Sequence, residues 1–409
     1  MWRQNSLRRN HRQTTAPVSF GIVEPGSTRL RLCVVEVYDG QSTVLGWAEG
    51  PGWKAGEASA AALVSTCDEA LVEAEEVARS SGGRWILPDR LVVGLPVSEL
   101  RGRSWAVVQQ RAQPSRVIDE KELEALLERA LRLAVNRLLS DEPGRGGWLL
   151  VDAVPVALTV DGRGVTDLVG FRGQEIGAAV FAAMTRVETI KAWGAVADDL
   201  EFSSLTLTAI PLALAAGLPV GHGILLDVGG AVTDLIWCGA GRPVVMESLS
   251  IGGNELTDAL ARKWGLTKDR AERLKRTYSD GRLSAEAESQ IQATLRPALT
   301  RWLEDTETAL ARLSHDEPLP QSLYLLGGGS ALPEMAEAVR SLAWSQRLRF
   351  DRYPEVRCLR PTDVPGVMNR SGRGRELGDV AALALASWVA DQQRSVARPA
   401  RILAELCQG

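Results

Sequence analysis

The stretch GILLDVGGAVTDLIW, residues 223–237, has the pattern of two buried strands joined by a turn that contains Gly229 and Gly230. Asp227 stands just before that turn. Glycine suits a tight turn because it lacks the Cβ atom that blocks close approach, and consecutive backbone N–H groups in such a turn bind phosphate oxygens. A simple hairpin has no need of Asp227. A site for an anion and a metal ion would use both the turn and the carboxylate.

A second stretch, VSFGIVEPGSTRLRLCVVEV at residues 18–37, follows the same plan. An apolar strand leads to Glu24, then to a turn with glycine and hydroxyl residues, then to a second strand with alternating apolar positions. Two copies roughly 200 residues apart indicate an internal duplication in which each copy heads its own domain. Two unrelated hairpins are the alternative, because short patterns of this kind are common.

The bulk composition excludes several classes of protein. The chain has 409 residues, enough for two to three domains, and a net charge of −4, which does not favour nucleic acid as a partner. Its five cysteines form no CxxC pair, so neither a disulfide framework nor a zinc site is expected. The pattern fits a protein of the reducing cytosol. Three histidines leave little scope for a histidine metal site. No apolar run reaches the roughly 18 residues of a membrane span.

Three glycine loops carry the candidate binding residues. The first turn offers Gly26, Ser27 and Thr28, the second offers Gly229, Gly230 and Thr233, and a later loop offers Gly327, Gly328 and Gly329. Glu24 and Asp227 precede the first two turns, and two carboxylates suffice for Mg²⁺, which keeps most of its waters. The third loop leads into a helix marked by Pro333, where a helix N-terminus attracts phosphate. Each loop alone also fits a purely structural turn.

Regular elements are predicted around these loops. A helix should end at Gly82-Gly83, and SRVIDEKELEALLERALRLAVNRLL is the clearest helix, capped near Asp119. Residues 254–314 should be mostly helical. QSLYLLGGGSALPEMAEAVRSL should form a strand, a glycine loop and a helix. EIGAAVFAAMTRVETIKAWG should be a helix or a strand leading into one.

The order of these motifs resembles the actin-like ATPase superfamily. LLDVGGAVTDLIW, SLSIGGNELTDALARKWGLTKDRAERLKRTYSDG and LYLLGGGSALPEM are similar to its second half. Within the superfamily, the resemblance is to the FtsA family of bacterial cell-division proteins, with the PilM family of pilus assembly as a near relative. VPVALTVDGRGVTDLVGFRGQEI, FSSLTLTAIPLALAAGL and LGDVAALALASW extend the likeness, which covers about residues 18–391 in the right order.

The resemblance implies an α/β fold: a duplicated actin-like (ribonuclease-H-like) pair of domains with a nucleotide cleft and an inserted α+β subdomain in the first half. The implied boundaries are a disordered basic tail at 1–17, domain I at 18–85 and 171–215, the inserted subdomain at 86–170, domain II at 216–364 with a helical part at 254–314, a return to domain I at 365–391, and a tail with a short amphipathic helix at 392–409.

The resemblance also assigns roles to the candidate residues. ATP would lie in the cleft with Mg²⁺, its phosphates on the first two turns and its adenosine near Gly327–Gly329. AERLKRTYS, residues 271–279, would be the nucleoside helix, with Glu272 on the ribose, Lys275 on the sugar or ring edge and Arg276 against adenine. By its pattern alone, this helix also fits a solvated charged surface.

Three departures from the family pattern bear on activity. Glu24 replaces the usual aspartate and is followed by Pro25, which removes a backbone donor. Ala231 stands where a third glycine is common. Ile210 stands where relatives place an acidic residue near the attacking water, so at most a slow ATPase is expected. A nucleotide-free scaffold is therefore an alternative.

Function follows from the resemblance as an expectation. An FtsA-type protein would polymerise and would bind the FtsZ C-terminal tail and later division proteins. It would tether FtsZ to the inner face of the cell membrane, and the termini of the chain would contact the membrane surface. A PilM-like cytoplasmic adaptor of a pilus or secretion machine is the alternative. A small-molecule kinase would need a base facing the γ-phosphate, and Asp152, Asp161 and Asp167 fall in the inserted subdomain instead.

Overall fold

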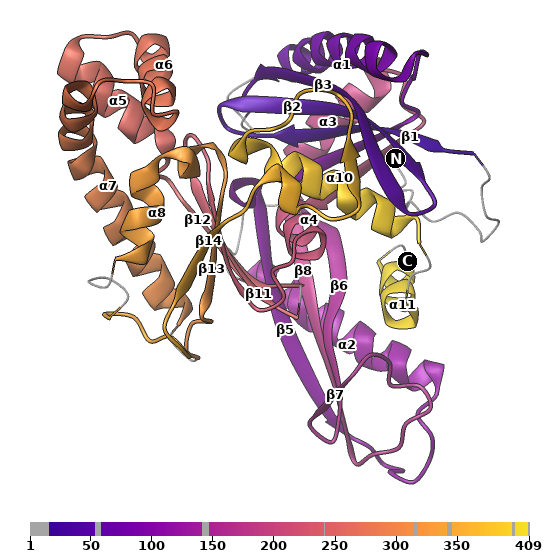
Figure 1. Cartoon of the computed structure of the whole chain (residues 1–409). Helices are drawn as coiled ribbons and strands as arrows, with labels where there is room; N and C mark the ends of the chain where they lie inside the picture. Colours follow the sequence, from indigo (N-terminus) through magenta and orange to yellow (C-terminus); the bar gives the residue numbers. More distant parts are fainter. Residues whose placement is uncertain are drawn as a thin grey trace.

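A computed structural model describes residues 16–53, 59–140, 147–240, 242–314, 317–341, 346–394 and 397–407. The basic tail expected at residues 1–17 therefore lies almost wholly outside the described residues. Figure 1 shows two layered halves side by side and a subdomain that projects away from them.

The first half is built on a sheet of six strands in the order β15-β3-β2-β1-β4-β9. These strands are β15 (Val367–Asn369), β3 (Gln41–Pro51), β2 (Arg29–Tyr38), β1 (Val18–Pro25), β4 (Arg90–Leu95) and β9 (Ser204–Ala209). One face packs against α1 (Ala60–Gly82) and α3 (Val187–Asp199), and the other against α4 (Ile210–Gly217) and α10 (Val380–Gln392).

The alternation along β2 explains this layering. Leu30, Leu32 and Val34 enter the core beneath α1, whereas Val35 and Val37 enter the core beneath α10. Helix α1 begins at the Ser59 cap and ends before Gly83, whose left-handed backbone stops the helix as the sequence predicts.

The second half repeats the strand topology of the first. Strands β10 (Gly223–Val228), β11 (Thr233–Gly239) and β12 (Arg242–Leu249) are antiparallel, and β13 (Ser322–Leu326) runs parallel to β10, with β14 (Glu355–Cys358) beside it. The first half has the same arrangement in β1, β2, β3, β4 and β9. The predicted duplication is thus confirmed.

Four helices pack against the second sheet around one core. They are α5 (Gly253–Trp264), α6 (Lys268–Ser279), α7 (Ala285–Leu313) and α8 (Pro333–Arg340). The helical character predicted for residues 254–314 is confirmed, as is the strand, glycine loop and helix of β13 and α8.

The projecting subdomain consists of β5 (Leu100–Gln110), α2 (Glu120–Ser140), β6 (Trp148–Val160), β7 (Arg163–Val165) and β8 (Glu175–Arg186). The predicted apolar face of α2 is buried, and Asp119 accepts a hydrogen bond from the Glu122 backbone N–H at 3.0 Å. Strand β8 leads directly into α3, and it pairs with both β5 and β6. The inserted unit therefore extends past the boundary expected at residue 170.

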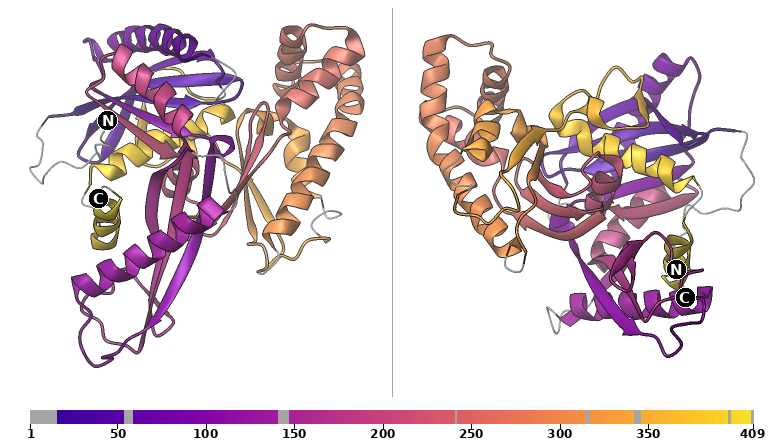
Figure 2. Two further views of the ribbon diagram at one scale, coloured as in Figure 1. Left: turned by 180° about the vertical axis from the view of Figure 1, so that it is seen from behind. Right: turned by 60° about the horizontal axis from the view of Figure 1, so that its bottom comes forward.

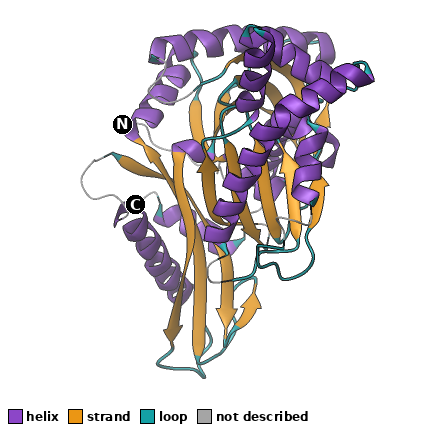
Figure 3. Cartoon of the chain, turned by 90° about the vertical axis from the view of Figure 1, so that its left-hand side faces the viewer, coloured by secondary structure: helices purple, strands orange, loops and turns teal. Residues whose placement is uncertain are grey.

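The subdomain also touches the second half. Strand β5 pairs with β12 through Arg103 and Val245, and the Ser104 hydroxyl donates to the Pro243 carbonyl at 2.8 Å. The two sets of strands thereby form one extended sheet of nine strands, and Figure 3 shows its long strands running into the projecting subdomain.

The C-terminal helix α11 (Arg398–Leu406) packs on the subdomain, where Figure 2 shows it beside the inserted strands. Its apolar residues Ile402 and Leu403 are buried in the core under α2, and Arg401 pairs with Glu120 at 2.6 Å. The amphipathic segment predicted near the C-terminus is therefore a helix whose apolar side contacts protein. No described helix is both long and apolar enough to cross a membrane.

Candidate functional site

The first two glycine turns touch each other across the boundary between the halves. Gly230 packs so closely on the first turn that a Cβ atom there would lie 2.1 Å from Cγ2 of Thr28. The backbone N–H of Ala231 donates to the Ser27 hydroxyl at 3.1 Å. The predicted turns are therefore brought together, and one N–H of the second turn already has a partner within the chain.

The third loop closes on the second turn. Gly327 has a φ of +85°, and a Cβ atom there would lie 2.3 Å from Oδ1 of Asp227. Both the left-handed backbone and the close approach require glycine at this position. Strand β13 lies parallel to β10, so the loops that follow the two strands meet at the same sheet edge.

These loops line a cavity of about 1370 Å³ between the two halves. That volume exceeds the range of roughly 300–1,000 Å³ typical of small-ligand sites. Eleven of the twelve residues predicted for ATP and both predicted metal ligands line it: Gly26, Ser27, Thr28, Gly229, Gly230, Glu272, Lys275, Arg276, Gly327, Gly328, Gly329, Glu24 and Asp227.

The exception is Thr233, which lies beneath the cavity rather than on its lining. Its hydroxyl donates to the Ile251 carbonyl at 2.7 Å and accepts from Trp302 Nε1 at 2.9 Å. Thr233 is fully buried, so its hydroxyl holds the turn onto α7 instead of facing a ligand.

Arg31 is a cavity residue that the sequence analysis missed. Its guanidinium donates to Glu24 at 2.7 Å and to Asp379 at 2.8 Å, and all three side chains are largely buried. Asp379 belongs to the short helix Leu377–Asp379 that precedes α10. Burial raises the pKa of Glu24, although the Arg31 charge favours the carboxylate. The alternation of Arg29 and Arg31 with apolar residues along β2 was the available signal.

A pair of aspartates forms the floor of the cavity. Asp227 and Asp234 lie opposite each other on β10 and β11, and both line the cavity. Burial, together with the negative charges of Asp234 and Glu24, raises the pKa of Asp227 to about 7. Burial also raises the pKa of Asp234 to about 6, while hydrogen bonds from Ser248 and the Val97 backbone oppose the shift.

The two predicted metal ligands differ in availability. Among the described residues, no hydrogen bond or ion pair engages the Asp227 carboxylate, whereas Glu24 is held by Arg31. No group of three or more acidic, histidine or cysteine side chains in the described ranges is arranged to hold a metal ion. Mg²⁺ commonly takes one or two protein carboxylates together with water and phosphate oxygens. The residues thus fit an Mg²⁺ ion that Asp227 would hold, because its carboxylate is not engaged by a described residue.

The predicted nucleoside helix is α6, and its three candidate residues face the cavity. Glu272 accepts from the Thr257 hydroxyl at 2.6 Å and pairs with Lys275 at 2.7 Å. Lys275 also donates to the Gly253 carbonyl at 3.0 Å, so it is anchored at the start of α5. This helix is a cavity wall rather than a fully solvated surface.

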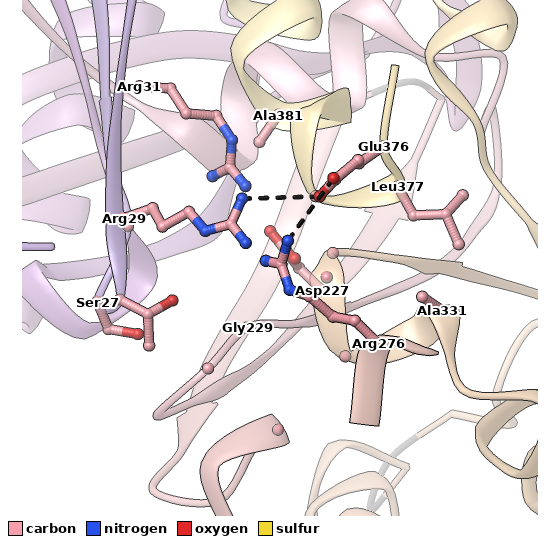
Figure 4. Close-up of a pocket in the computed structure, with 18 of the residues that line it drawn as sticks. Ser27, Arg29, Arg31, Asp227, Gly229, Arg276, Ala331, Glu376, Leu377 and Ala381 are labelled. Carbon is pink, nitrogen blue, oxygen red and sulfur yellow. Dashed lines mark ion pairs between the residues drawn. The ribbon is translucent and has the colours of Figure 1, made fainter. Parts of the chain in front are cut away.

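One acidic side chain bridges the two halves at this cavity. Figure 4 shows Glu376 between Arg29 of the first half and Arg276 of α6, at 3.6 Å and 3.7 Å respectively. Pairs of this length between partly exposed groups contribute little stability individually. Glu376 was not predicted, because its two partners come from distant parts of the chain.

Comparison with known proteins agrees with this architecture. Residues 224–378 match the family model described as "Cell division protein FtsA". No curated protein sequence matches the chain. The solved structure of a PilM-PilN type IV pilus biogenesis complex aligns at 21% identity over 94% of this chain and 100% of that chain, with a TM-score of 0.62.

Two more distant structures align at lower scores. The ethanolamine utilization protein EutJ from Carboxydothermus hydrogenoformans has 14% identity over 93% of this chain and 91% of its own, with a TM-score of 0.48. MreB 5 of Spiroplasma citri bound to AMPPNP has 11% identity over 90% and 94%, with a TM-score of 0.41. The chain has the duplicated actin-like ATPase fold, and it resembles FtsA and PilM.

Proposed function

We propose that the chain binds ATP with Mg²⁺ in the cavity between its halves. The supporting observation is the convergence of three glycine loops, from both halves, around the Asp227 carboxylate, which no described residue engages in a hydrogen bond or ion pair. The backbone N–H groups of the turns would hold phosphate, and Asp227 would hold the metal ion. Mg²⁺ would supply the positive charge that offsets both the phosphates and the acidic floor.

The cellular role we propose is of the FtsA type. ATP binding would control assembly of the chain with itself and recruitment of the FtsZ C-terminal tail and later division proteins at the inner face of the cell membrane. The match of residues 224–378 to the FtsA family model supports this role, because it spans the cavity-lining part of the second half.

A PilM-like cytoplasmic adaptor is the second candidate. The packing of α11 favours it, because Ile402 and Leu403 are buried against the subdomain and are not presented to a membrane. The alignment to the PilM-PilN complex, which covers 94% of this chain, agrees with it at the level of fold. Such an adaptor would bind a partner protein without inserting a helix of its own.

Slow hydrolysis at most is part of the proposal. Ile210 is the cavity residue at the position where an acidic group would activate water, and Asp234 is engaged by Ser248 and the Val97 backbone. A hydrolase must orient and activate water through a polar group. The site is therefore better suited to holding nucleotide than to cleaving it.

Calorimetry of Mg-ATP binding tests the nucleotide proposal. We expect the wild type to bind and Asp227→Ala to lose about 10- to 150-fold in affinity, the equivalent of about 1.5–3 kcal/mol for an interaction with a charged group. Asp199→Ala, which changes an exposed aspartate at the end of α3, is the control and should bind like the wild type. Absence of binding by the wild type would leave an actin-like scaffold without nucleotide.

Sedimentation with anionic liposomes, with and without Mg-ATP, separates the two roles. Pelleting that depends on ATP and is lost when residues 397–409 are deleted would support the division role. A chain that stays in the supernatant but binds a pilus-type partner peptide would support the adaptor.

A further inference from the structure

The inserted subdomain joins the body through two adjacent chain segments. The incoming segment contains the short helix Val97–Glu99, and the outgoing segment runs from β8 into α3. The Thr185 hydroxyl of β8 donates to the Glu99 carbonyl at 2.7 Å and ties the two segments together. These contacts, together with the pairing of β5 with β12, therefore set the orientation of the subdomain.

One carboxylate reaches from the subdomain into the body at this place. Asp152 lies in β6 beside an irregularity in its pairing with β8. Its Oδ2 atom accepts from the Ala209 backbone N–H at 2.6 Å and from the Thr208 hydroxyl at 3.0 Å. Ala209 is the residue that precedes α4, and that helix has no side-chain cap of its own. A carboxylate from another subdomain thus lies beside the N-terminus of α4, where negative charge is favourable.

The start of α4 is in turn part of the cavity wall. Ile210, the first residue of α4, lines the cavity. Its side chain is packed so tightly that a Cβ atom at Gly94 would lie 2.7 Å from Ile210 Cγ1. Ile210 is thus tightly packed, and it directly follows Ala209, whose backbone N–H is bound by Asp152.

A second aspartate contacts the same junction from the other side. Asp234, on the cavity floor, is hydrogen-bonded by the Val97 backbone of the incoming segment. The junction is therefore held by the second half through Asp234 and by the subdomain through Asp152.

We propose that Asp152 is a positioning residue that couples the orientation of the inserted subdomain to the occupancy of the cavity, through the first residues of α4. This inference rests on the proposed function, because it assigns a regulatory contact to the same nucleotide cavity. Coupling between two sites is reciprocal, so a protein bound to the subdomain would change nucleotide affinity by the same factor, typically about 5- to 150-fold.

Hydrogen–deuterium exchange of the full chain, with and without Mg-ATP, tests this coupling. In the wild type we expect Mg-ATP to change exchange both in residues 208–217 and in the β6 segment 148–160. Asp152→Ala should lose the β6 response. Its Mg-ATP affinity, measured in parallel, should stay within about threefold of the wild type, because the residues proposed to contact the nucleotide are unchanged. Asp152→Asn, which has nearly the same shape, guards against a folding defect and should give a weaker response than the wild type.

Asp161→Ala is the matched control. Asp161 belongs to the same subdomain and likewise accepts two backbone N–H groups, from Gln174 and Glu175 at 2.8 Å each, but it does not line the cavity or contact α4. Its β6 response should equal that of the wild type. A full β6 response in Asp152→Ala would overturn the inference.

A ligand-free comparison keeps this test separate from the test of nucleotide binding. Without nucleotide, Asp152→Ala should raise exchange in residues 208–217 and in residues 148–160 together. Asp161→Ala should not raise exchange in both segments. If the wild type binds no ATP, the proposed function fails, yet a joint rise still supports the mechanical contact. A rise confined to residues 148–160 rejects the contact whether or not ATP binds.

Discussion

The two glycine turns occupy equivalent places in the duplicated halves, yet their carboxylates have opposite surroundings. In the first turn, Glu24 is paired with Arg31, which is also held by Asp379. In the second, no described cation forms an ion pair with Asp227, and burial and the charges of Asp234 and Glu24 raise its pKa more than the Arg31 charge lowers it. The carboxylate of the first turn is thus engaged by an ion pair, whereas that of the second turn is not. The two halves share the backbone plan of the turn but differ in the surroundings of its carboxylate.

The largest expected effect comes from breaking the first turn. Arg31→Ala would leave Glu24 and Asp379 buried without their cation, a situation that typically costs about 3–5 kcal/mol. We expect the free energy of unfolding, measured by urea denaturation, to fall by that amount. Arg29→Ala, which removes a more exposed cation two residues away, should cost less than about 1 kcal/mol. Equal losses in the two variants would contradict the difference drawn between the arginines.

Removing the charge of the second turn should raise the free energy of unfolding instead of lowering it. Asp227→Asn removes a buried carboxylate whose burial and acidic neighbours outweigh the favourable charge of Arg31, so the ligand-free protein should become more stable by about 1–3 kcal/mol at pH 8. The same variant should bind Mg-ATP more weakly. Urea denaturation at fixed pH, paired with calorimetry, measures both. A variant that is less stable than the wild type would show that Asp227 has a structural partner.

The pH dependence of that stabilisation has a defined sign. The pKa of Asp227 is about 7 in the folded chain against an ordinary value of 3.8, so the folded state binds the proton more tightly than the unfolded state. Protonation therefore favours folding at low pH, and this contribution is lost as the pH rises through about 7. The stability difference between Asp227→Asn and the wild type should be largest near pH 8 and nearly vanish near pH 4. A difference that grows toward acid would refute this assignment.

The smallest expected effect concerns the backbone of the first turn. Pro25→Ala restores an N–H group next to Glu24, which sharpens the comparison by making the two turns more alike. One additional hydrogen bond contributes about 0.5–1.5 kcal/mol, so Mg-ATP affinity should rise by no more than about tenfold. Calorimetry alongside the wild type measures the change. A loss of affinity would mean that the rigid proline shapes the turn.

Local patterns predicted much of the fold and most of the cavity lining. The period-two alternation of β2, the glycine end of α1 and the apolar face of α2 follow from short-range rules, and the repeated turn indicated the duplication. The family resemblance, rather than a local pattern, predicted that the glycine loops share one site, and the parallel pairing of β10 with β13 brings two of them to the same sheet edge.

What escaped prediction depends on long-range pairing. Arg31 and Asp379 are 348 positions apart, and no local pattern identifies one as the partner of the other. The same is true of Glu376 between its two arginines. Thr233 was predicted to face phosphate because it follows the turn, but its position on β11 directs the hydroxyl toward Trp302. The docking of α11 was missed because an amphipathic helix fits a protein groove and a membrane surface equally well.

The bond between the Ala231 backbone and the Ser27 hydroxyl has a thermodynamic consequence. On the proposed function, a phosphate that accepts the Ala231 N–H would replace this internal bond, so part of the heat released by the new contact would be offset by the heat absorbed when the old one opens. Nucleotide association should therefore show a modest exothermic signal and a compensating gain in the freedom of the two turns. The heat of association should become more exothermic in Ser27→Ala. In that variant the Ala231 N–H has no Ser27 hydroxyl to release before it binds the ligand.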